Sequence, residues 1–196
     1  MSSTAVTPAR LPSARRATSS AARRANLLVD SPRAAEPLLR RLEELGGVRF
    51  LVLTHQDDVA DHEAMARRFG CERVLHQADV TRGTADVERK VAGSDPIGLA
   101  EDLLLIPVPG HTRGSVALLF RGVLFSGDHL WADEKGRLEA SRGVCWYSWE
   151  AQIESLRRLL GFRFSVVLPG HRRRYRAESP EEARAELARL VSRLAG

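Results

Sequence analysis

Short apolar runs alternate with amphipathic stretches from Asn26 to the end of the chain. The apolar runs predict strands at 26–29, 48–53, 73–76, 103–108, 115–120, 123–126 and 165–168. Apolar residues that recur every three or four positions predict helices at about 31–44, from the Asp61-His62 pair to Gly70, and at about 149–160 and 180–194. Strands that alternate with helices in this order are typical of an α/β domain.

Capping and turn residues mark several ends of these elements. Ser31 and Pro32 supply a cap and a first-turn proline for the first helix. Ser179 and Glu182 have the spacing of a capping box at the start of the last helix. The dipeptide Arg121-Gly122 separates two apolar runs by only two residues, so it predicts a β-hairpin.

The size and composition of the chain fit one domain. A chain of 196 residues that is 43% hydrophobic can bury one good core, and we expect residues 26–196 to form it. The two cysteines, Cys71 and Cys145, are too few for a disulfide framework and lack the paired spacing of a thiolate zinc site. They favour a cytoplasmic location, and no apolar run reaches the roughly 18 residues of a membrane span.

The first 25 residues differ in composition from the rest. They hold five arginines and no acid, and they have too few large apolar residues to offset the entropy cost of ordering, so we expect disorder there. An organellar transit peptide is the alternative interpretation of such a segment. The rest of the chain has 25 basic and 25 acidic side chains, so the net charge of +5 gives little reason to expect a nucleic-acid partner.

The segment Thr54–His62 holds five potential metal ligands directly after an apolar run. They are two histidines and three acids: His55, Asp57, Asp58, Asp61 and His62. Three more ligand types follow later apolar runs, each in a short Gly-containing segment: His111, Asp128 and His171. Open α/β sheets usually bind ligands beyond the carboxyl ends of their strands. This recurrence predicts a metal site at one edge of the domain.

These motifs, taken together and in order, resemble those of the metallo-β-lactamase superfamily of metal-dependent hydrolases. The matching segments are Leu27-Leu28-Val29-Asp30, Thr54-His55 with Asp61-His62, Pro109-Gly110-His111-Thr112-Arg113-Gly114-Ser115, Gly127-Asp128 and Gly170-His171. The resemblance implies a four-layer αβ/βα sandwich. Because the family usually begins with extra strands before the position of Asn26, the first sheet is expected to lack its first strands.

The resemblance also implies a centre of one or two divalent metal ions, zinc above all, with iron or manganese as alternatives. His55 and His111 would bind the first metal, and Asp61, His62 and His171 the second. Asp128 would bridge the two ions, and Asp61 would orient the nucleophile. Histidine and carboxylate ligands without thiolate suit such a catalytic centre.

The first motif departs from the family pattern His-x-His-x-Asp-His. An acid stands where the second histidine is expected, and two extra residues precede Asp61-His62. Asp57 is the preferred substitute because it lies two residues after His55, on the same side of an extended backbone. Asp58 is the rival, because it would share a helix face with Asp61 and His62. A carboxylate here is expected to shift metal preference towards iron or manganese.

Several other residues have a structural and a functional interpretation. Trp146, Tyr147 and Trp149 could line a substrate entrance, but packing at the start of a helix is the favoured interpretation. His76 and His129 are expected to be structural or to support a ligand. The run from Arg172 to Arg176 could attract an anionic substrate, although a solvated loop is the more common explanation of such a run.

The motifs predict a hydrolase that attacks an ester or thioester bond of a small-molecule substrate, which the arginine run suggests is anionic. The Pro-Gly-His-Thr-x-Gly-Ser segment resembles hydroxyacylglutathione hydrolases, but one helix follows His171 where those enzymes have a helical substrate domain. A β-lactamase is disfavoured because the amino terminus lacks an apolar export signal. The alternatives are a phosphodiesterase or nuclease, a persulfide dioxygenase that uses one iron, and a non-catalytic truncated relative.

Overall fold

The computed structural model of the chain describes residues 26–195, so the expectations for residues 1–25 lie outside the described part. A first sheet of parallel strands has the order β1 (Leu27–Val29), β2 (Phe50–Val52), β3 (Glu72–His76) and β4 (Arg89–Val91). Its register places Leu28 opposite Leu51, and Leu51 opposite Arg73.

A second sheet of six strands has the order β12-β11-β8-β7-β6-β5. Its strands are β5 (Ile97–Ala100), β6 (Leu103–Pro107), β7 (Val116–Phe120), β8 (Val123–Gly127), β11 (Val166–Pro169) and β12 (Tyr175–Arg176). β7 and β8 form the predicted hairpin, and Arg121 and Gly122 have the positive φ angles of 47° and 79° that such a two-residue turn requires. β8 and β11 are parallel, whereas the other pairs in this sheet are antiparallel.

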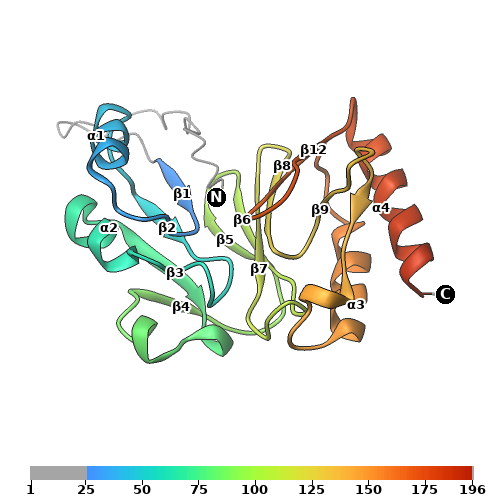
Figure 1. Cartoon of the computed structure of the whole chain (residues 1–196), viewed down its shortest axis with the longest axis horizontal. Helices are drawn as coiled ribbons and strands as arrows, with labels where there is room; N and C mark the ends of the chain where they lie inside the picture. The colour runs from blue at the N-terminus through green and yellow to red at the C-terminus, as the bar shows by residue number, and fades with distance from the viewer. Residues whose placement is uncertain (1–25, 196) are drawn as a thin grey trace.

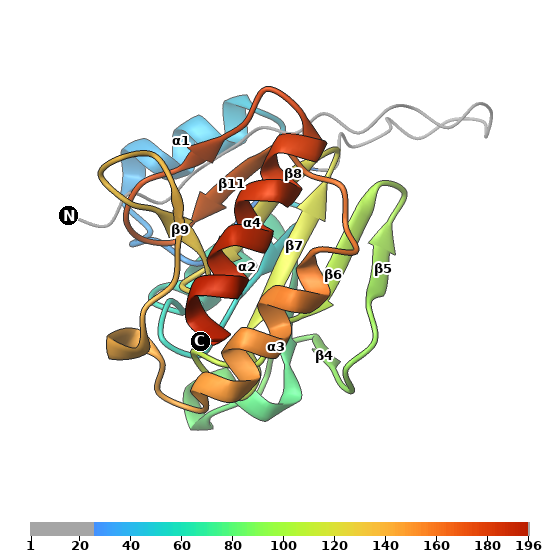
Figure 2. The same cartoon turned by 90° about the vertical axis from the view of Figure 1, so that its right-hand side faces the viewer.

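Four helices cover the outer faces of the two sheets (Figure 1). α1 (Glu36–Glu44) and α2 (His62–Phe69) pack on the first sheet, and α3 (Trp149–Leu159) and α4 (Pro180–Ala195) pack on the second. Figure 2 shows α3 and α4 in front of the second sheet. A third apolar cluster joins the two sheets, so the order of layers is helix, sheet, sheet, helix, as the sequence predicts.

The second sheet brings three predicted ligands to the same edge. β6, β8 and β11 run in the same direction, because β7 is antiparallel to both β6 and β8 and β11 is parallel to β8. The chain therefore leaves each of these strands at the same edge, shortly before His111, Asp128 and His171. A short ladder of β9 (Trp131–Ala132) and β10 (Leu138–Glu139) follows the second of these positions.

The structure corrects the start of the first helix. α1 begins at Glu36, with Pro37 in its first turn, and not near Ser31. The backbone N–H of Ser31 instead donates to the carbonyl of Asp58 at 3.0 Å, so this segment supports the loop that carries the acids. Within the described residues, no helix is long and apolar enough to cross a membrane.

Candidate metal centre

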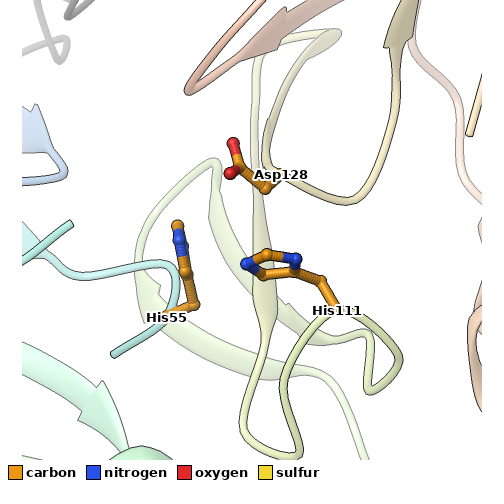
Figure 3. A group of neighbouring side chains, drawn as sticks. All are labelled: His55, His111 and Asp128. Carbon is orange, nitrogen blue, oxygen red and sulfur yellow. The ribbon is translucent and has the colours of Figure 1, made fainter. Parts of the chain in front are cut away.

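His55, His111 and Asp128 form one group of potential ligands at the edge where the two sheets meet. One ligand atom from each residue lies within 4.8 Å of the other two. The imidazole rings of His55 and His111 meet edge to face with centroids 4.7 Å apart, and the carboxylate of Asp128 lies beside both rings (Figure 3). Each side chain comes from a different strand end, so the fold itself assembles this group.

Asp58, Asp128 and His171 form a second group of the same kind. Oδ2 of Asp58 lies 3.2 Å from Nε2 of His171, and Oδ2 of Asp128 lies 3.8 Å from that nitrogen. Ligands about 2.0–2.1 Å from a tetrahedral zinc ion lie about 3.3 Å from each other, so these separations suit a shared cation. Asp128 belongs to both groups, and it therefore occupies the position of a bridging ligand.

Asp57 and Asp58 point towards different groups. Oδ2 of Asp57 lies 3.5 Å from Nε2 of His111. Oδ2 of Asp58 lies 4.0 Å from Nε2 of His55 and closer to His171. The sequence offers Asp57 and Asp58 as alternative substitutes for one missing histidine ligand. The structure instead places Asp57 beside His111 of the first group and Asp58 beside His171 of the second.

Hydrogen bonds at Nδ1 hold the rings of His55 and His111 so that Nε2 of each ring faces the centre. Nδ1 of His111 contacts the carbonyl of Val144, which can only accept, so the proton is on Nδ1. The hydroxyl of Thr54 donates to Asp30 and must then accept from Nδ1 of His55 at 2.9 Å. In the neutral form of each ring, Nε2 therefore carries the free lone pair, and in the described part of the chain neither Nε2 atom has a hydrogen-bond partner.

The structure does not bring Asp61 and His62 to the centre, contrary to the expectation from the family pattern. Nδ1 of His62 accepts from the guanidinium of Arg73, and its Nε2 contacts the carbonyl of Gly83 at 3.1 Å, so both ring nitrogens are engaged. Asp61 stands at the N-cap position of α2 without a side-chain capping bond, and its carboxylate accepts from the backbone N–H of Ala34 at 2.8 Å. The two extra residues in this motif carry Asp61-His62 away, and Asp58 lies in their place.

The electrostatics of the site favour a cation. Burial, with smaller contributions from the carboxylates of Asp58 and Asp128, raises the pKa of Asp30 to about 7 against the hydrogen bonds from Thr54. Burial lowers the pKa of His55, as does the neighbouring His111. A lowered pKa favours the neutral form of His55, and a neutral imidazole beside several carboxylates is what a divalent cation requires. The donor set and its unpartnered buried atoms therefore fit a metal centre of one or two ions.

Asp79 is a supporting residue that the sequence pattern does not identify. It is buried, and its carboxylate accepts from the N–H of Gly114 at 2.6 Å, from the hydroxyl of Thr112 and from the N–H of Gln56 at 3.1 Å. It thereby connects the loop of His55 to the loop of His111. Its only signal in the sequence is an acid soon after a strand, since residues 77–79 form a single 3-10 turn.

The remaining candidates lie around the centre. His76 is structural, because both ring nitrogens contact backbone groups, and His129 is buried beside the bridging acid. The guanidinium of Arg172 lies over the ring of Trp131 at 4.7 Å, while Trp146 and Tyr147 are exposed. A cavity of about 520 Å³ adjoins the second group of ligands, and it is lined by residues that include Asp57, Asp58 and His171, by Arg33, and by apolar side chains such as Phe125 and Leu168.

Comparison with known proteins gives one consistent family. The model of the family described as the metallo-beta-lactamase superfamily matches residues 23–171. A hydroxyacylglutathione hydrolase of Rhodospirillum rubrum is 32% identical over 151 residues, which cover 73% of this chain and 56% of that enzyme. The chain spans about half the length of the curated relatives it matches.

Two solved structures have a similar fold. The B3 metallo-beta-lactamase BLEG-1 has a TM-score of 0.65 at 19% identity, over 87% of this chain and 89% of that one. ETHE1 from Myxococcus xanthus has a TM-score of 0.62 at 21% identity, over 89% of this chain and 78% of that one. At these identities the likeness concerns the fold alone, and it agrees with the layered sandwich described above.

Proposed function

The chain belongs to the metallo-beta-lactamase superfamily, and on that premise we propose that it is a metal-dependent hydrolase that cleaves an ester or thioester bond of a small molecule. One observation carries the proposal. Asp128 belongs to two ligand groups at once, and His55 and His111 beside it present buried Nε2 atoms without hydrogen-bond partners towards the same space. This is the arrangement that a centre of two ions with a bridging carboxylate needs.

The ligand set divides between the two positions. His55, His111 and Asp57 would hold one ion, Asp58 and His171 the other, and Asp128 both. When bound, such ions lower the pKa of a water molecule so that hydroxide is available near neutral pH, and they polarise a carbonyl. Zinc suits the histidines, and the carboxylates of Asp57 and Asp58 also suit iron or manganese.

The chain's own residues would orient the nucleophile and fix the tautomers of the histidine ligands. Asp58 is the carboxylate that lies beside both His55 and His171, so we assign to it the orienting role that the family pattern gives to Asp61. Thr54 and the Val144 carbonyl keep the protons of His55 and His111 on the side away from the substrate. The ligands therefore need no rearrangement of protons before the reaction begins.

The substrate class follows from the curated relatives, which are hydroxyacylglutathione hydrolases. We infer a thioester as the first class to test. The cavity beside Asp58 and His171 has Arg33 on its wall, and this cation could pair with a carboxylate on the substrate. Because the chain spans about half of those relatives, glutathione itself remains a proposal, and so does a cytoplasmic location.

The test is hydrolysis by purified protein loaded separately with zinc, iron or manganese. A panel of thioesters, phosphodiesters and persulfides distinguishes the reaction classes, and metal content is measured on the same samples. His111→Ala and Asp128→Ala should lose both metal and turnover. Turnover that persists in both metal-depleted variants would remove the proposal.

A second candidate is an iron-dependent dioxygenase. The first ligand group consists of two histidines and one carboxylate, the set that many non-haem iron oxygenases use. It predicts oxygen uptake that depends on a persulfide and on iron. An iron-loaded protein that consumes oxygen and leaves every thioester intact would favour this candidate over the hydrolase.

A further inference from the structure

Trp146 and Tyr147 contradict the expectation that they pack at the start of a helix. They are 69% and 52% exposed, and they are the large apolar side chains left exposed in the described residues. Trp149 alone behaves as expected, because it packs against the apolar core beneath α3. Two adjacent aromatic side chains in water are costly unless they bind something, so their position relative to the metal centre matters.

The backbone of this segment is fastened to the loop of His111. The N–H of Trp146 donates to the carbonyl of His111 at 2.9 Å, and the N–H of Ser148 donates to the carbonyl of Gly110 at 3.2 Å. In the opposite direction, Nδ1 of His111 donates to the carbonyl of Val144. Ser148 then caps α3 by accepting from the N–H of Ala151. The exposed aromatic residues therefore stand on a backbone that is held from both sides.

The indole of Trp146 lies next to a metal ligand. Its ring centroid is 6.4 Å from that of His111, with the two planes tilted by 58°. An ion bound to Nε2 of His111 would lie about 3 Å from that imidazole centroid, and therefore within about 10 Å of the indole. A substrate group that is joined to the scissile bond through a linker of two or three carbon atoms spans this distance.

We propose that Trp146 and Tyr147 form an aromatic patch that binds an apolar group of the substrate, preferably an aromatic ring, and so sets substrate preference. The inference rests on the proposed hydrolase and extends it to a substrate class. Trp146 approaches the centre from the side of His111, whereas the cavity beside Asp58 and His171 is lined by other residues, so the patch offers a separate apolar surface next to the metal ligands. Side chains on a fixed backbone lose little entropy on binding, which favours this use.

The first experiment compares matched thioesters. Acetyl and 4-phenylbutanoyl thioesters of one thiol differ only in the acyl end, and acetate thioesters of ethanethiol and 2-phenylethanethiol differ only in the thiol end. The wild-type protein should prefer the phenyl member of at least one pair in kcat/KM. Trp146→Ala should reduce that ratio about tenfold, as expected for loss of one apolar contact, and Trp146→Phe should restore most of it. Metal content and melting temperature are measured alongside.

The second experiment detects binding without turnover. The chain has three tryptophans, so the ¹⁵N-labelled protein gives three indole N–H signals, and Trp146→Phe identifies the one from Trp146. Added 4-phenylbutanoate should shift that signal, whereas butanoate should not. The indole signals of Trp131 and Trp149 serve as internal controls.

The outcomes separate this inference from the proposed function. A phenyl-dependent shift without hydrolysis of any thioester would reject the hydrolase and support the patch. Hydrolysis with an unchanged preference in Trp146→Ala, and no shift of its indole signal, would overturn the patch alone. A shift that depends on protein concentration and not on the phenyl compound would assign the patch to contact between copies, which also overturns the inference.

Discussion

Replacing Asp30 with asparagine should stabilise the metal-free protein at alkaline pH. Asp30 is buried, and its Oδ1 accepts from the N–H of Thr54 at 2.7 Å and from the hydroxyl of Thr54 at 2.8 Å. Asparagine keeps this acceptor and cannot ionise. The variant therefore removes the charge while it preserves the contacts that hold Thr54, and through Thr54 the ring of His55.

The magnitude follows from the pKa of Asp30. Burial, with smaller effects from Asp58 and Asp128, raises that pKa from 3.8 to about 7 in the folded chain. Between these values the unfolded chain binds fewer protons than the folded one, so the free energy of unfolding falls as pH rises. At 1.36 kcal/mol per unit, the total loss is about 4 kcal/mol by pH 8, of which about 2.5 kcal/mol falls between pH 5 and pH 8.

The assay is urea unfolding of wild type and Asp30→Asn in the presence of a chelator, at pH 5 and pH 8. The difference in free energy between the two proteins isolates Asp30, because every other titrating group is common to both. The free energy of unfolding of Asp30→Asn minus that of wild type should be about 2.5 kcal/mol larger at pH 8 than at pH 5. A constant difference would refute the argument, since it would show that Asp30 ionises in the folded chain as it does in the unfolded one.

Three further predictions concern the supports of the site and its metal. Asp79→Ala removes the acceptor for Gly114, Thr112 and Gln56, so it should destabilise the fold by about 2–3 kcal/mol and weaken metal binding. Chemical denaturation and metal titration measure the two effects, and an unchanged unfolding free energy together with an unchanged metal affinity would contradict this role of Asp79. Gly110→Ala would place a Cβ 2.6 Å from the backbone of Gln152 at a φ of 157°, so a loss of about 3 kcal/mol is expected in thermal unfolding, and a fully stable variant would contradict this packing. Chelation of the metal should lower Tm, because Asp57, Asp58 and Asp128 then repel one another, and an unchanged Tm would mean that the purified protein held no metal.

The apolar runs predicted most strands because they end at clear turns, and the family resemblance supplied the order of the layers. The two-residue strands β9, β10 and β12 were missed, and so were β4 and β5. In β4 and β5, Arg89-Lys90 and Gly98 interrupt the apolar pattern, and pairing with a neighbouring strand supplies the stability instead. Pairing with a neighbouring strand is a tertiary effect, and it cannot be predicted from the local pattern of apolar residues.

The candidate site was predicted in part for a similar reason. His55, His111, Asp128 and His171 follow strand ends, so the topology of the sheets determines where they meet. The role of Asp58 depends on the path of an irregular loop, which the Ser31 backbone helps to hold. His62 matched the family motif by its letters, but its ring nitrogens are occupied by Arg73 and Gly83, which are distant in sequence.

The central claim is that the two ligand groups share Asp128 and that Asp58, not His62, completes the second group. The most direct measurement is metal content per chain by mass spectrometry for wild type, Asp128→Ala, Asp58→Ala and His62→Gln, each checked for folding by circular dichroism. We expect two ions in wild type and in His62→Gln, fewer in Asp58→Ala, and nearly none in Asp128→Ala. Loss of an ion in His62→Gln together with a full complement in Asp58→Ala would contradict this claim.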